Sequence, residues 1–271
     1  MSSANRGVAL VTGASTGIGY ATAITLAKAG FRVFGTSRKP TSDGPVGVTM
    51  RVCDVSDDAS VSKLVSDIVA ETGRIDLLVN NAGVGLVGGA EESSISQAQQ
   101  LFNINFFGIF RATNAVLPIM RRQKSGRIIN MSSVLGLIPA PFLALYAASK
   151  HAVEGYSESL DHEVRAQGVR VILVEPAYTR TSFEENRTEV DRTLEIYNQD
   201  RDRMGAVIRK AMETGDMPQV VAEAVLKAAT AHTPKHRYTA GKMARQVSVL
   251  RRFVPESLFD KSLRKQNGLP V

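Results

Sequence analysis

The chain has 271 residues, of which 44% are hydrophobic and 22% charged, a balance typical of a globular protein with enough length for one large core. No apolar stretch approaches the roughly 18 residues that a membrane-spanning helix needs, and the first residues lack the apolar core of a signal peptide. The net charge of +7 comes from dispersed Lys and Arg with only 6% aromatic residues, which disfavours a nucleic-acid partner. We expect a cytoplasmic protein whose residues 1–271 form a single α/β domain, with a phosphorylated cofactor or anionic substrate accounting for the basic excess.

Cysteine usage argues against disulfide and metal chemistry. The single cysteine, Cys53, lies in the apolar run VTMRVCDV and has no partner for an internal disulfide. We interpret it as buried packing rather than a nucleophile. No Cys/His cluster has metal-ligand spacing, so no metal site is expected.

Short β-branched runs alternate with longer amphipathic stretches along the whole chain. Strands are predicted at residues 7–12, 31–36, 48–52, 75–80, 127–131, 169–174 and 237–240. Helices are predicted at residues 18–29, 57–71, 95–122, 145–167 and 218–229. Runs such as LLVN and VILVE are apolar on both faces, which indicates a parallel sheet covered by helices on each side. The pattern predicts one doubly wound Rossmann-type α/β fold with a seven-stranded parallel sheet.

Two segments fall outside this alternation. Residues 179–215 are crowded with charges and are long for a connection, so we interpret them as a substrate lid, with a mobile surface excursion as the alternative. Residues 241–271 form a C-terminal extension. Its apolar residues could close a pocket, pack on another subunit or touch a membrane surface: Val247, Leu250, Phe253, Val254, Leu258 and Phe259.

A glycine-rich turn links the first predicted strand to the first predicted helix. Such glycines allow a tight turn and close approach to a pyrophosphate, while the helix N-terminus supplies free N–H groups and a positive dipole. The predicted phosphate-binding residues are Gly13, Ser15, Thr16, Gly17, Ile18 and Gly19. The spacing G-x-x-x-G-x-G after the TGAS lead-in resembles the short-chain dehydrogenase/reductase family, which uses a nicotinamide dinucleotide.

The end of the second predicted strand indicates which dinucleotide is bound. An NAD site would carry an acidic residue there, but the chain has Ser37, Arg38 and Lys39, and no acid occurs before Asp43. A guanidinium beside the ribose favours a 2′-phosphate, so we predict NADP(H). The alternative is that Arg38 merely caps an exposed strand end.

Two further motifs match the family pattern on the cofactor side. Asp54 and Val55 resemble the pair that flanks the adenine, and the motif N-N-A-G resembles the one beside the adenosine ribose, with Asn81, Ala82 and Gly83 as predicted contacts. Asn and Gly also dominate ordinary turns, but this motif follows a parallel strand, where ligands bind in such sheets.

A tyrosine and a lysine four residues apart carry the predicted chemistry. Tyr146 and Lys150 share one face of a predicted helix, and a neighbouring ammonium stabilises a phenolate and lowers its pKa. With Ser133 and Asn105 they resemble the family's Asn, Ser, Tyr-x-x-x-Lys tetrad. The resemblance implies that Ser133 binds the substrate oxygen, Tyr146 transfers its proton, Lys150 tunes Tyr146 and binds the nicotinamide ribose, and Asn105 holds a linking water.

The tetrad assignment has alternatives. Ser132 and Ser149 are runner-up hydroxyls, and each tetrad residue alone could be structural: a helix-interior Asn, a strand-end Ser, a packed Tyr.

A last motif follows the sixth predicted strand. The segment from Pro176 to Thr181 resembles the family's Pro-Gly-x-x-x-Thr, which contacts the nicotinamide, with Pro176, Thr179 and Thr181 as predicted contacts. Ala177 stands where the family has glycine, which leaves the local backbone geometry open.

The resemblance predicts an NADP(H)-dependent oxidoreductase acting on a carbonyl or alcohol, near 17β-hydroxysteroid and retinol dehydrogenases and forming homodimers or homotetramers. Candidate walls of a lipophilic pocket are Val84, Leu86, Leu135, Leu137, Pro139, Phe142 and Leu143. The rival functions are a 3-oxoacyl-thioester reductase, which would use the basic surface to bind an acidic carrier, and a non-catalytic NADP-binding redox sensor.

Overall fold

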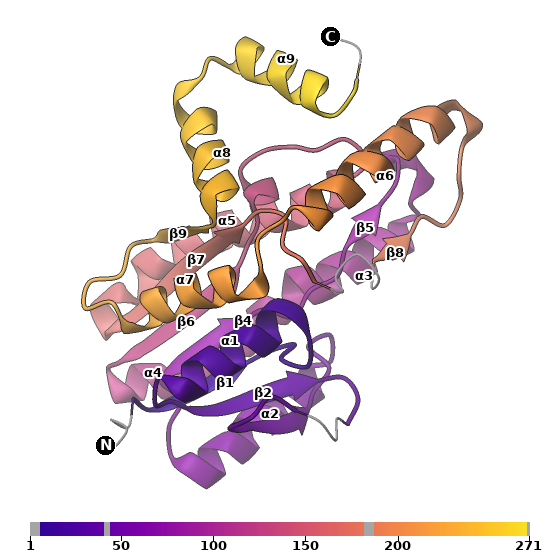
Figure 1. The fold of residues 1–271 in the computed structure, drawn as a ribbon. Coiled ribbons are helices and arrows are strands. Elements are labelled where there is room, and N and C mark those ends of the chain that lie inside the picture. The colour runs from indigo at the N-terminus through magenta and orange to yellow at the C-terminus, as the bar shows by residue number, and fades with distance from the viewer. Residues whose placement is uncertain (1–5, 41–43, 182–186, 270–271) are drawn as a thin grey trace.

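The structure is a computed structural model that describes residues 6–40, 44–181 and 187–269. Its centre is a parallel sheet with the strand order β3-β2-β1-β4-β6-β7-β9 (Figure 1). The seven strands are β1 (Val8–Val11), β2 (Arg32–Ser37), β3 (Val48–Val52), β4 (Leu77–Asn80), β6 (Gly126–Met131), β7 (Val169–Pro176) and β9 (Arg237–Ala240). Each overlaps a predicted strand, so the predicted doubly wound Rossmann-type fold is confirmed.

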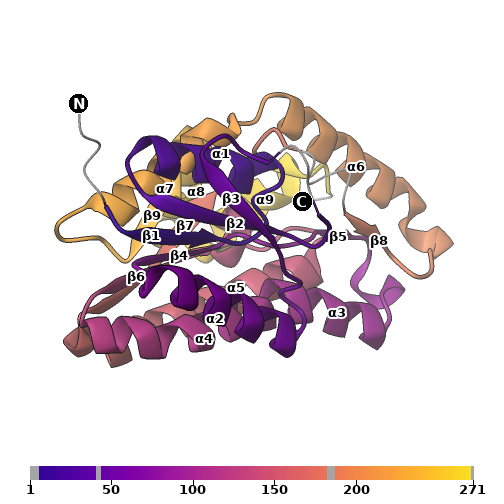
Figure 2. The same ribbon diagram turned by 90° about the horizontal axis from the view of Figure 1, so that it is seen from below.

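Helices cover both faces of the sheet, as expected for strands that are apolar on both faces. In Figure 2 the sheet lies between two helical layers, with α1 (Gly17–Lys28) and α7 (Pro218–Thr230) on one side. The other layer holds α2 (Asp58–Thr72), α4 (Phe107–Gln123) and α5 (Ala144–Val164). Alternate residues of β1 belong to different cores, because Val8 and Leu10 pack in one cluster and Ala9 and Val11 in the other.

One predicted helix is wrong in its length. Residues 95–122 form two helices, α3 (Ile95–Asn105) and α4, separated at Phe106, whose φ of −115° departs from that of a regular helix. Pro118, the one strong helix breaker in the segment, lies inside α4 instead. The break therefore follows from tertiary packing rather than from local propensity.

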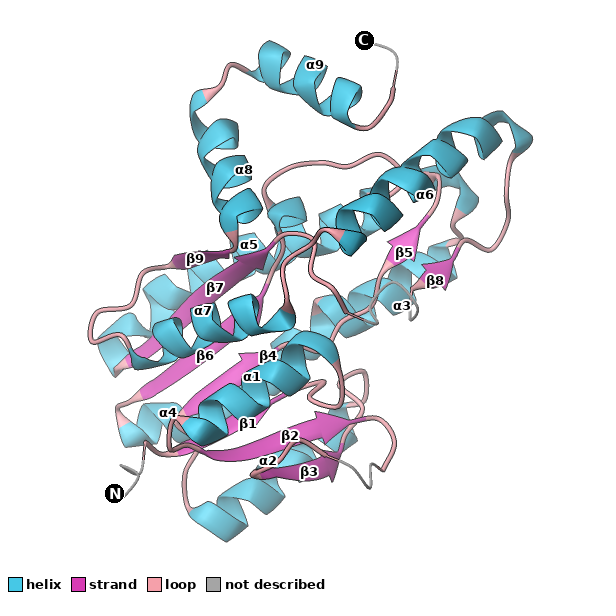
Figure 3. Ribbon diagram, viewed as in Figure 1, coloured by secondary structure: helices cyan, strands magenta, loops and turns pink. Residues whose placement is uncertain are grey.

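The predicted lid segment contains regular structure of its own. Strand β8 (Thr188–Glu189) pairs with β5 (Leu86–Val87) in a small second sheet, and α6 (Asn198–Glu213) follows (Figure 3). Residues 182–186 of this predicted lid lie outside the described residues. Short 3₁₀ turns occur at Ala90–Glu92, Val134–Gly136, Arg165–Gln167 and Glu195–Tyr197.

The C-terminal extension forms two more helices. Helix α8 (Lys242–Phe253) follows the edge strand β9 directly, and α9 (Glu256–Gln266) comes next (Figure 1). Among the residues that the structure describes, no helix combines the length and apolarity needed to cross a bilayer.

Candidate active site

A cavity of about 550 Å³ lies where the carboxyl ends of the strands meet, the usual ligand position in such sheets. Its walls contain every residue predicted to contact the cofactor: Gly13, Ser15, Thr16, Gly17, Ile18, Gly19, Ser37, Arg38, Asp54, Val55, Asn81, Ala82, Gly83, Tyr146, Lys150, Pro176, Thr179 and Thr181. Ser133 also lines the cavity, whereas Asn105 does not. Residues spread over most of the chain thus face one space.

The glycine loop is shaped so that side chains are excluded from it. Gly13 has a φ of +64°, and a Cβ placed there would lie 3.0 Å from the Ala82 Cα. A Cβ on Gly19 would collide with the Gly13 carbonyl oxygen. Helix α1 begins at Gly17 with no acidic residue in its first turn, and the Thr16 side chain makes no capping hydrogen bond. The loop and the helix N-terminus fit the pyrophosphate of a dinucleotide.

The N-N-A-G motif braces this loop. The backbone N–H groups of Asn81 and Ala82 each donate to Thr12 Oγ1 at 3.0 Å. The Asn81 amide donates to the carbonyl oxygens of Thr12 and Gly13, each at 3.0 Å. Asn81 therefore fixes the glycine turn in addition to lining the cavity.

Ser37, Arg38 and Asp54 lie together at the end of the cavity beyond β2. Asp54 Oδ1 accepts hydrogen bonds from the Ser56 hydroxyl at 2.6 Å and the Ser56 N–H at 2.8 Å. These bonds, with a smaller contribution from Arg38, hold the pKa of Asp54 below its usual value. Arg38 is exposed at the rim, where an added phosphate would meet its charge.

Ser133 and Tyr146 lie side by side in the cavity wall. Ser133 Oγ accepts from the Leu135 N–H at 3.1 Å and is also hydrogen-bonded to Tyr146. Burial raises the pKa of Tyr146 to about 12, and the Ser133 hydrogen bond only partly opposes this. The net pKa of Tyr146 is therefore raised rather than lowered, because desolvation of the phenolate dominates, and the influence of Lys150 on Tyr146 stays a prediction.

Lys150 is almost entirely buried beside Tyr146. Its Nζ donates to the Met131 carbonyl at 2.9 Å and lies 5.6 Å from the centre of the Tyr146 ring. Burial lowers the pKa of Lys150 to about 8, and the carboxylate of Glu154 opposes that shift. The ammonium form thus still predominates at neutral pH.

Asn105 lies behind the wall at the break between α3 and α4. Its amide donates to the Val84 carbonyl at 2.9 Å, and its oxygen accepts from the Val84 N–H at 2.8 Å. A third bond, from the Asn105 amide, reaches Ser149 Oγ, and that hydroxyl donates to the Tyr146 carbonyl. Asn105 and Ser149 therefore link the loop after β4 to the first turn of α5.

The runner-up Ser132 also lines the cavity, but its hydroxyl contacts a group outside the tetrad. Its hydroxyl lies beside the Glu154 carboxyl, under Gly136. The Ala177 substitution leaves the backbone ordinary: among the described non-glycine residues, positive φ values occur at Lys124 and Phe142, not at Ala177.

The substrate end of the cavity is largely apolar. Four predicted wall residues line it, namely Val84, Leu135, Pro139 and Leu143. Three other predicted wall residues do not: Leu86, Leu137 and Phe142. Sequence reasoning missed the residues contributed by α6, α8 and α9, which are Val207, Ile208, Ala211, Met212, Met243, Leu263 and Gln266. For α6 the available signal was the apolar pair Met204 and Ile208, four residues apart in an otherwise charged segment.

The apolar residues predicted in the C-terminal extension divide into two groups. Val247 lines the cavity, whereas Leu250, Phe253 and Leu258 are exposed and Val254 and Phe259 are half-buried outside it. The extension therefore contributes one side of α8 to the cavity and leaves other apolar side chains toward solvent.

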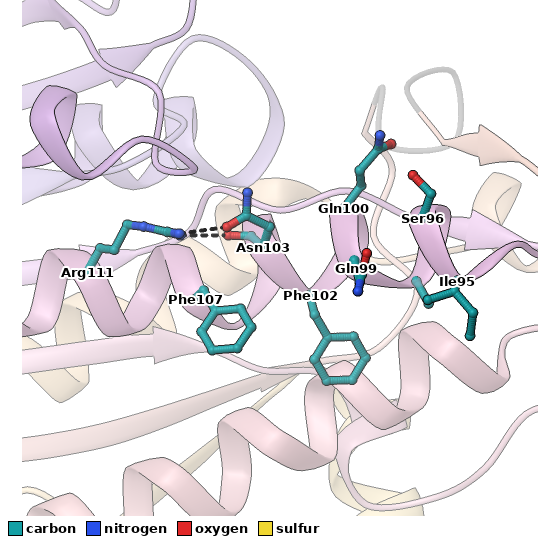
Figure 4. Close-up of a pocket in the computed structure, with 9 residues that line it drawn as sticks. Ile95, Ser96, Gln99, Gln100, Phe102, Asn103, Phe107 and Arg111 are labelled. Carbon is teal, nitrogen blue, oxygen red and sulfur yellow. Dashed lines mark hydrogen bonds between the residues drawn. The ribbon is translucent and has the colours of Figure 1, made fainter.

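A second, shallower hollow of about 680 Å³ lies over the junction of α3 and α4 (Figure 4). Its lining residues are Ile95, Ser96, Ala98, Gln99, Gln100, Phe102, Asn103, Phe107 and Arg111. The Arg111 guanidinium, the charged group among them, donates to Asn103 Oδ1 at 2.7 Å and to the Asn103 carbonyl at 3.1 Å. The residues that line this hollow include no carboxyl, imidazole or thiol group, and Arg111 is ion-paired with Asp58, so we place the chemistry in the first cavity.

Fold and cavity together define a nucleotide-binding oxidoreductase of Rossmann type. The family model described as short chain dehydrogenase matches residues 7–192, and the chain belongs to that family. A 3-ketodihydrosphingosine reductase from Bacteroides thetaiotaomicron is 37% identical over 260 residues, covering 95% of this chain and 96% of the relative. Bovine retinol dehydrogenase 8 is 37% identical over 252 residues, covering 85% of this chain and 80% of the relative.

Solved structures agree with this assignment. A short-chain dehydrogenase from Streptomyces avermitilis superposes with a TM-score of 0.82 at 29% identity, covering 97% of this chain and 98% of that one. A Burkholderia phymatum member in complex with NAD gives 0.79 at 27%, covering 96% and 97%. A metagenomic oxidoreductase in complex with NADP gives 0.68 at 29%, covering 89% and 100%. The similar solved structures thus include one in complex with NAD and one in complex with NADP.

Proposed function

We propose that this protein is an NADP(H)-dependent oxidoreductase that interconverts a carbonyl and an alcohol on a lipophilic substrate. One observation carries the proposal: Ser133, Tyr146 and Lys150 line the same cavity as the glycine loop of Gly13 to Gly19. Proton chemistry and dinucleotide binding therefore share one enclosed space.

The chain's residues supply orientation and a proton. The bound dinucleotide supplies or accepts the hydride. Ser133 Oγ and the Tyr146 hydroxyl both bind the substrate oxygen, and Tyr146 donates its proton to the alkoxide that develops during reduction. The buried Lys150 ammonium stabilises the phenolate left behind. In oxidation Tyr146 takes the proton back.

Arg38 supports the choice of NADP(H). It lies on the cavity rim beside Ser37 and Asp54, where its guanidinium can contact a 2′-phosphate. The end of β2 carries Ser37, Arg38 and Lys39 instead of the acidic residue that binds the ribose hydroxyls in NAD sites.

The apolar walls support a lipophilic substrate. Side chains from α6 and α8, including Ile208, Met212 and Val247, extend the cavity beyond Tyr146. A sphingoid-base ketone reductase and a retinol dehydrogenase among the relatives are consistent with that substrate class. We infer that α6 is part of a substrate lid, and that the protein works as a cytoplasmic homo-oligomer.

The test is NADPH oxidation against a panel of steroid, retinoid, long-chain ketone, quinone and oxoacyl-thioester carbonyls. Turnover should be fastest with a lipophilic ketone or aldehyde. Preference for carrier-bound or CoA-bound oxoacyl groups would favour the 3-oxoacyl reductase instead. Tight NADPH binding without oxidation by any carbonyl would favour the redox sensor.

Replacing the proton donor tests the mechanism separately. Tyr146→Phe should lower kcat by about 10²–10⁴-fold, the usual contribution of a positioned acid, while NADPH affinity is unchanged. Fluorescence titration of NADPH and steady-state kinetics measure the two quantities. Most of the activity surviving in this variant would contradict the role of Tyr146.

A further inference from the structure

A ladder of titratable side chains continues beyond the tetrad along α5. At four-residue intervals the helix carries Tyr146, Lys150, Glu154, Glu158 and His162, so each group is adjacent to the next in a row that winds slowly around the helix. The ladder runs from the cavity toward the surface: Glu154 is buried, whereas the Glu158 side chain is 46% exposed. The mechanism described above uses only its first two members.

Glu154 belongs to a cluster of three carboxyls around one guanidinium. Arg237 NH2 lies 3.0 Å from Glu154 Oε2, and Arg237 Nε lies 3.0 Å from Glu175 Oε1. Arg237 also forms an ion pair with Glu158. Strands β7 and β9 contribute Glu175 and Arg237, so the cluster connects the edge of the sheet to α5.

The cluster has fewer hydrogen bonds than its burial demands. Glu175 is fully buried, and among the described residues its carboxyl has Arg237 as its polar contact, at Oε1. Apart from the neighbouring Ser132 hydroxyl, Glu154 Oε1 has no described partner. Burial, followed by the charge of Glu154, raises the pKa of Glu175 to about 7. A buried carboxyl with a pKa near 7 can gain or lose a proton at neutral pH, so Glu175 is more than an ion-pair partner of Arg237.

Charge balance links the cluster to the active site. Among the described residues, the buried Lys150 ammonium donates its hydrogen bond to a carbonyl oxygen, that of Met131. The carboxylate that favours its charged form is Glu154, one helical turn away. Met131 and Ser132 connect the two at the end of β6, because the Met131 carbonyl accepts from Lys150 and the Ser132 hydroxyl adjoins Glu154.

We propose that Glu154 is a positioning residue that holds the positive charge of Lys150 beside Tyr146, so that a buried carboxyl beyond the tetrad sets the pH range of proton transfer. The proposal rests on the function proposed above. The other charged groups around Glu154 are Lys150 and Glu158 on α5, Glu175 on β7 and Arg237 on β9, with His162 and His236 beyond Glu158.

The sign of the effect follows from electrostatics. A nearby negative charge makes any group release its proton at higher pH, so loss of the Glu154 charge makes the Tyr146–Lys150 pair release its proton at lower pH. Glu154→Gln keeps the shape and an oxygen for Arg237. It should move the alkaline limb of kcat for carbonyl reduction about one pH unit lower.

Matched variants separate charge from packing. Glu158→Gln removes another carboxylate of Arg237 but lies two turns from Lys150, and it should leave the limb unchanged. Glu154→Asp retains the charge and should keep the alkaline limb of kcat at its wild-type position. Coinciding profiles for Glu154→Gln and Glu158→Gln, or an Asp variant that behaves like the Gln variant, would overturn the proposal.

A second variant covers a folding failure of Glu154→Gln. Arg237→Met removes the cation that neutralises Glu154 and Glu175, so the carboxylates act more strongly on Lys150 and the limb should move to higher pH, opposite to the shift in Glu154→Gln. An unshifted limb in a folded Arg237→Met protein would count against the proposal.

A measurement without turnover distinguishes this proposal from the proposed function. ¹³C-labelled lysine spectra, assigned with Lys150→Arg, report the titration of Lys150 directly. Its midpoint should fall by about one pH unit in Glu154→Gln and stay in place in Glu158→Gln. If no carbonyl is reduced but this midpoint moves, the proposed function fails and the coupling stands. An unmoved midpoint in an active enzyme refutes the coupling alone.

Discussion

At the scale of single residues, the proposed preference for NADP(H) rests on one side chain at the cavity rim, that of Arg38. Arg38→Asp replaces a cation that a 2′-phosphate would bind with an anion that repels it. We expect NADPH affinity to fall about ten- to a hundredfold, the usual range for losing a charge-assisted bond, while NADH affinity is retained. Isothermal titration with both dinucleotides measures the difference.

The neighbouring Lys39 provides the control. Lys39→Asp makes the same charge change one residue away, at an exposed position outside the cavity wall. It should affect NADPH binding much less than Arg38→Asp. Equal losses of NADPH and NADH affinity in the Arg38 variant would refute the assignment.

Local motifs predicted the cofactor half of the cavity because each one ends a strand. Gly13, Asp54 and Asn81 follow β1, β3 and β4, and parallel strands bring their carboxyl ends to one edge. The electrostatics of Tyr146 were not predictable in this way. Sequence spacing showed a nearby ammonium, but the cost of burying a phenolate depends on the whole cavity wall.

At the scale of elements, the strands were predictable and their long-range partners were not. LLVN and VILVE are buried on both faces, which is a local signal. The pairing of Leu86 with Thr188 joins two-residue strands about a hundred residues apart, and no local pattern encodes it. The break at Phe106 was missed for a similar reason, since Asn105 binds the Val84 backbone in a distant loop.

Other long-range contacts, made by Glu92, anchor the proposed lid helix α6. Glu92 is fully buried, and its carboxylate accepts from the Gly89 N–H at 2.6 Å and the Leu194 N–H at 2.7 Å. It also forms an ion pair with Arg201 in α6. One carboxylate therefore ties the 3₁₀ turn of residues 90–92 to the start of the lid helix.

Weakening this anchor should affect substrate more than cofactor. Glu92→Gln replaces an accepting oxygen with an NH₂ group that faces the donors of Gly89, Leu194 and Arg201. Because this weakens the attachment of α6, we expect KM for a lipophilic substrate to rise about tenfold with NADPH affinity unchanged. Hydrogen exchange in residues 198–213 should become faster. Glu91→Gln is the control, because the Glu91 carboxylate contacts Tyr197 rather than Arg201. Unchanged KM and exchange rates in the Glu92 variant would argue against α6 as a lid.

At the scale of the whole molecule, an exposed aromatic surface remains on the layer formed by α4 and α5. Phe107 and Phe110 are 46% and 42% exposed, although Phe110 packs edge-on against Tyr156 of α5 at 5.9 Å. Exposed aromatic side chains grouped on one face mark protein contacts more often than isolated ones do. This surface lies on the opposite side of the sheet from α1 and α7 (Figure 2). A second chain bound to it would therefore not contact those two helices.

A charge placed on that surface tests the proposed homo-oligomer. Phe110→Glu would bury a carboxylate in a helix-to-helix contact, so sedimentation velocity should show dissociation to a single chain. NADPH affinity should persist, because the cavity is built within one chain. Val46→Glu makes a similar change at a position 84% exposed and outside α4 and α5, and should leave the assembly intact. A wild-type protein that sediments as one chain, or a Phe110 variant that stays assembled, would exclude this surface as the interface.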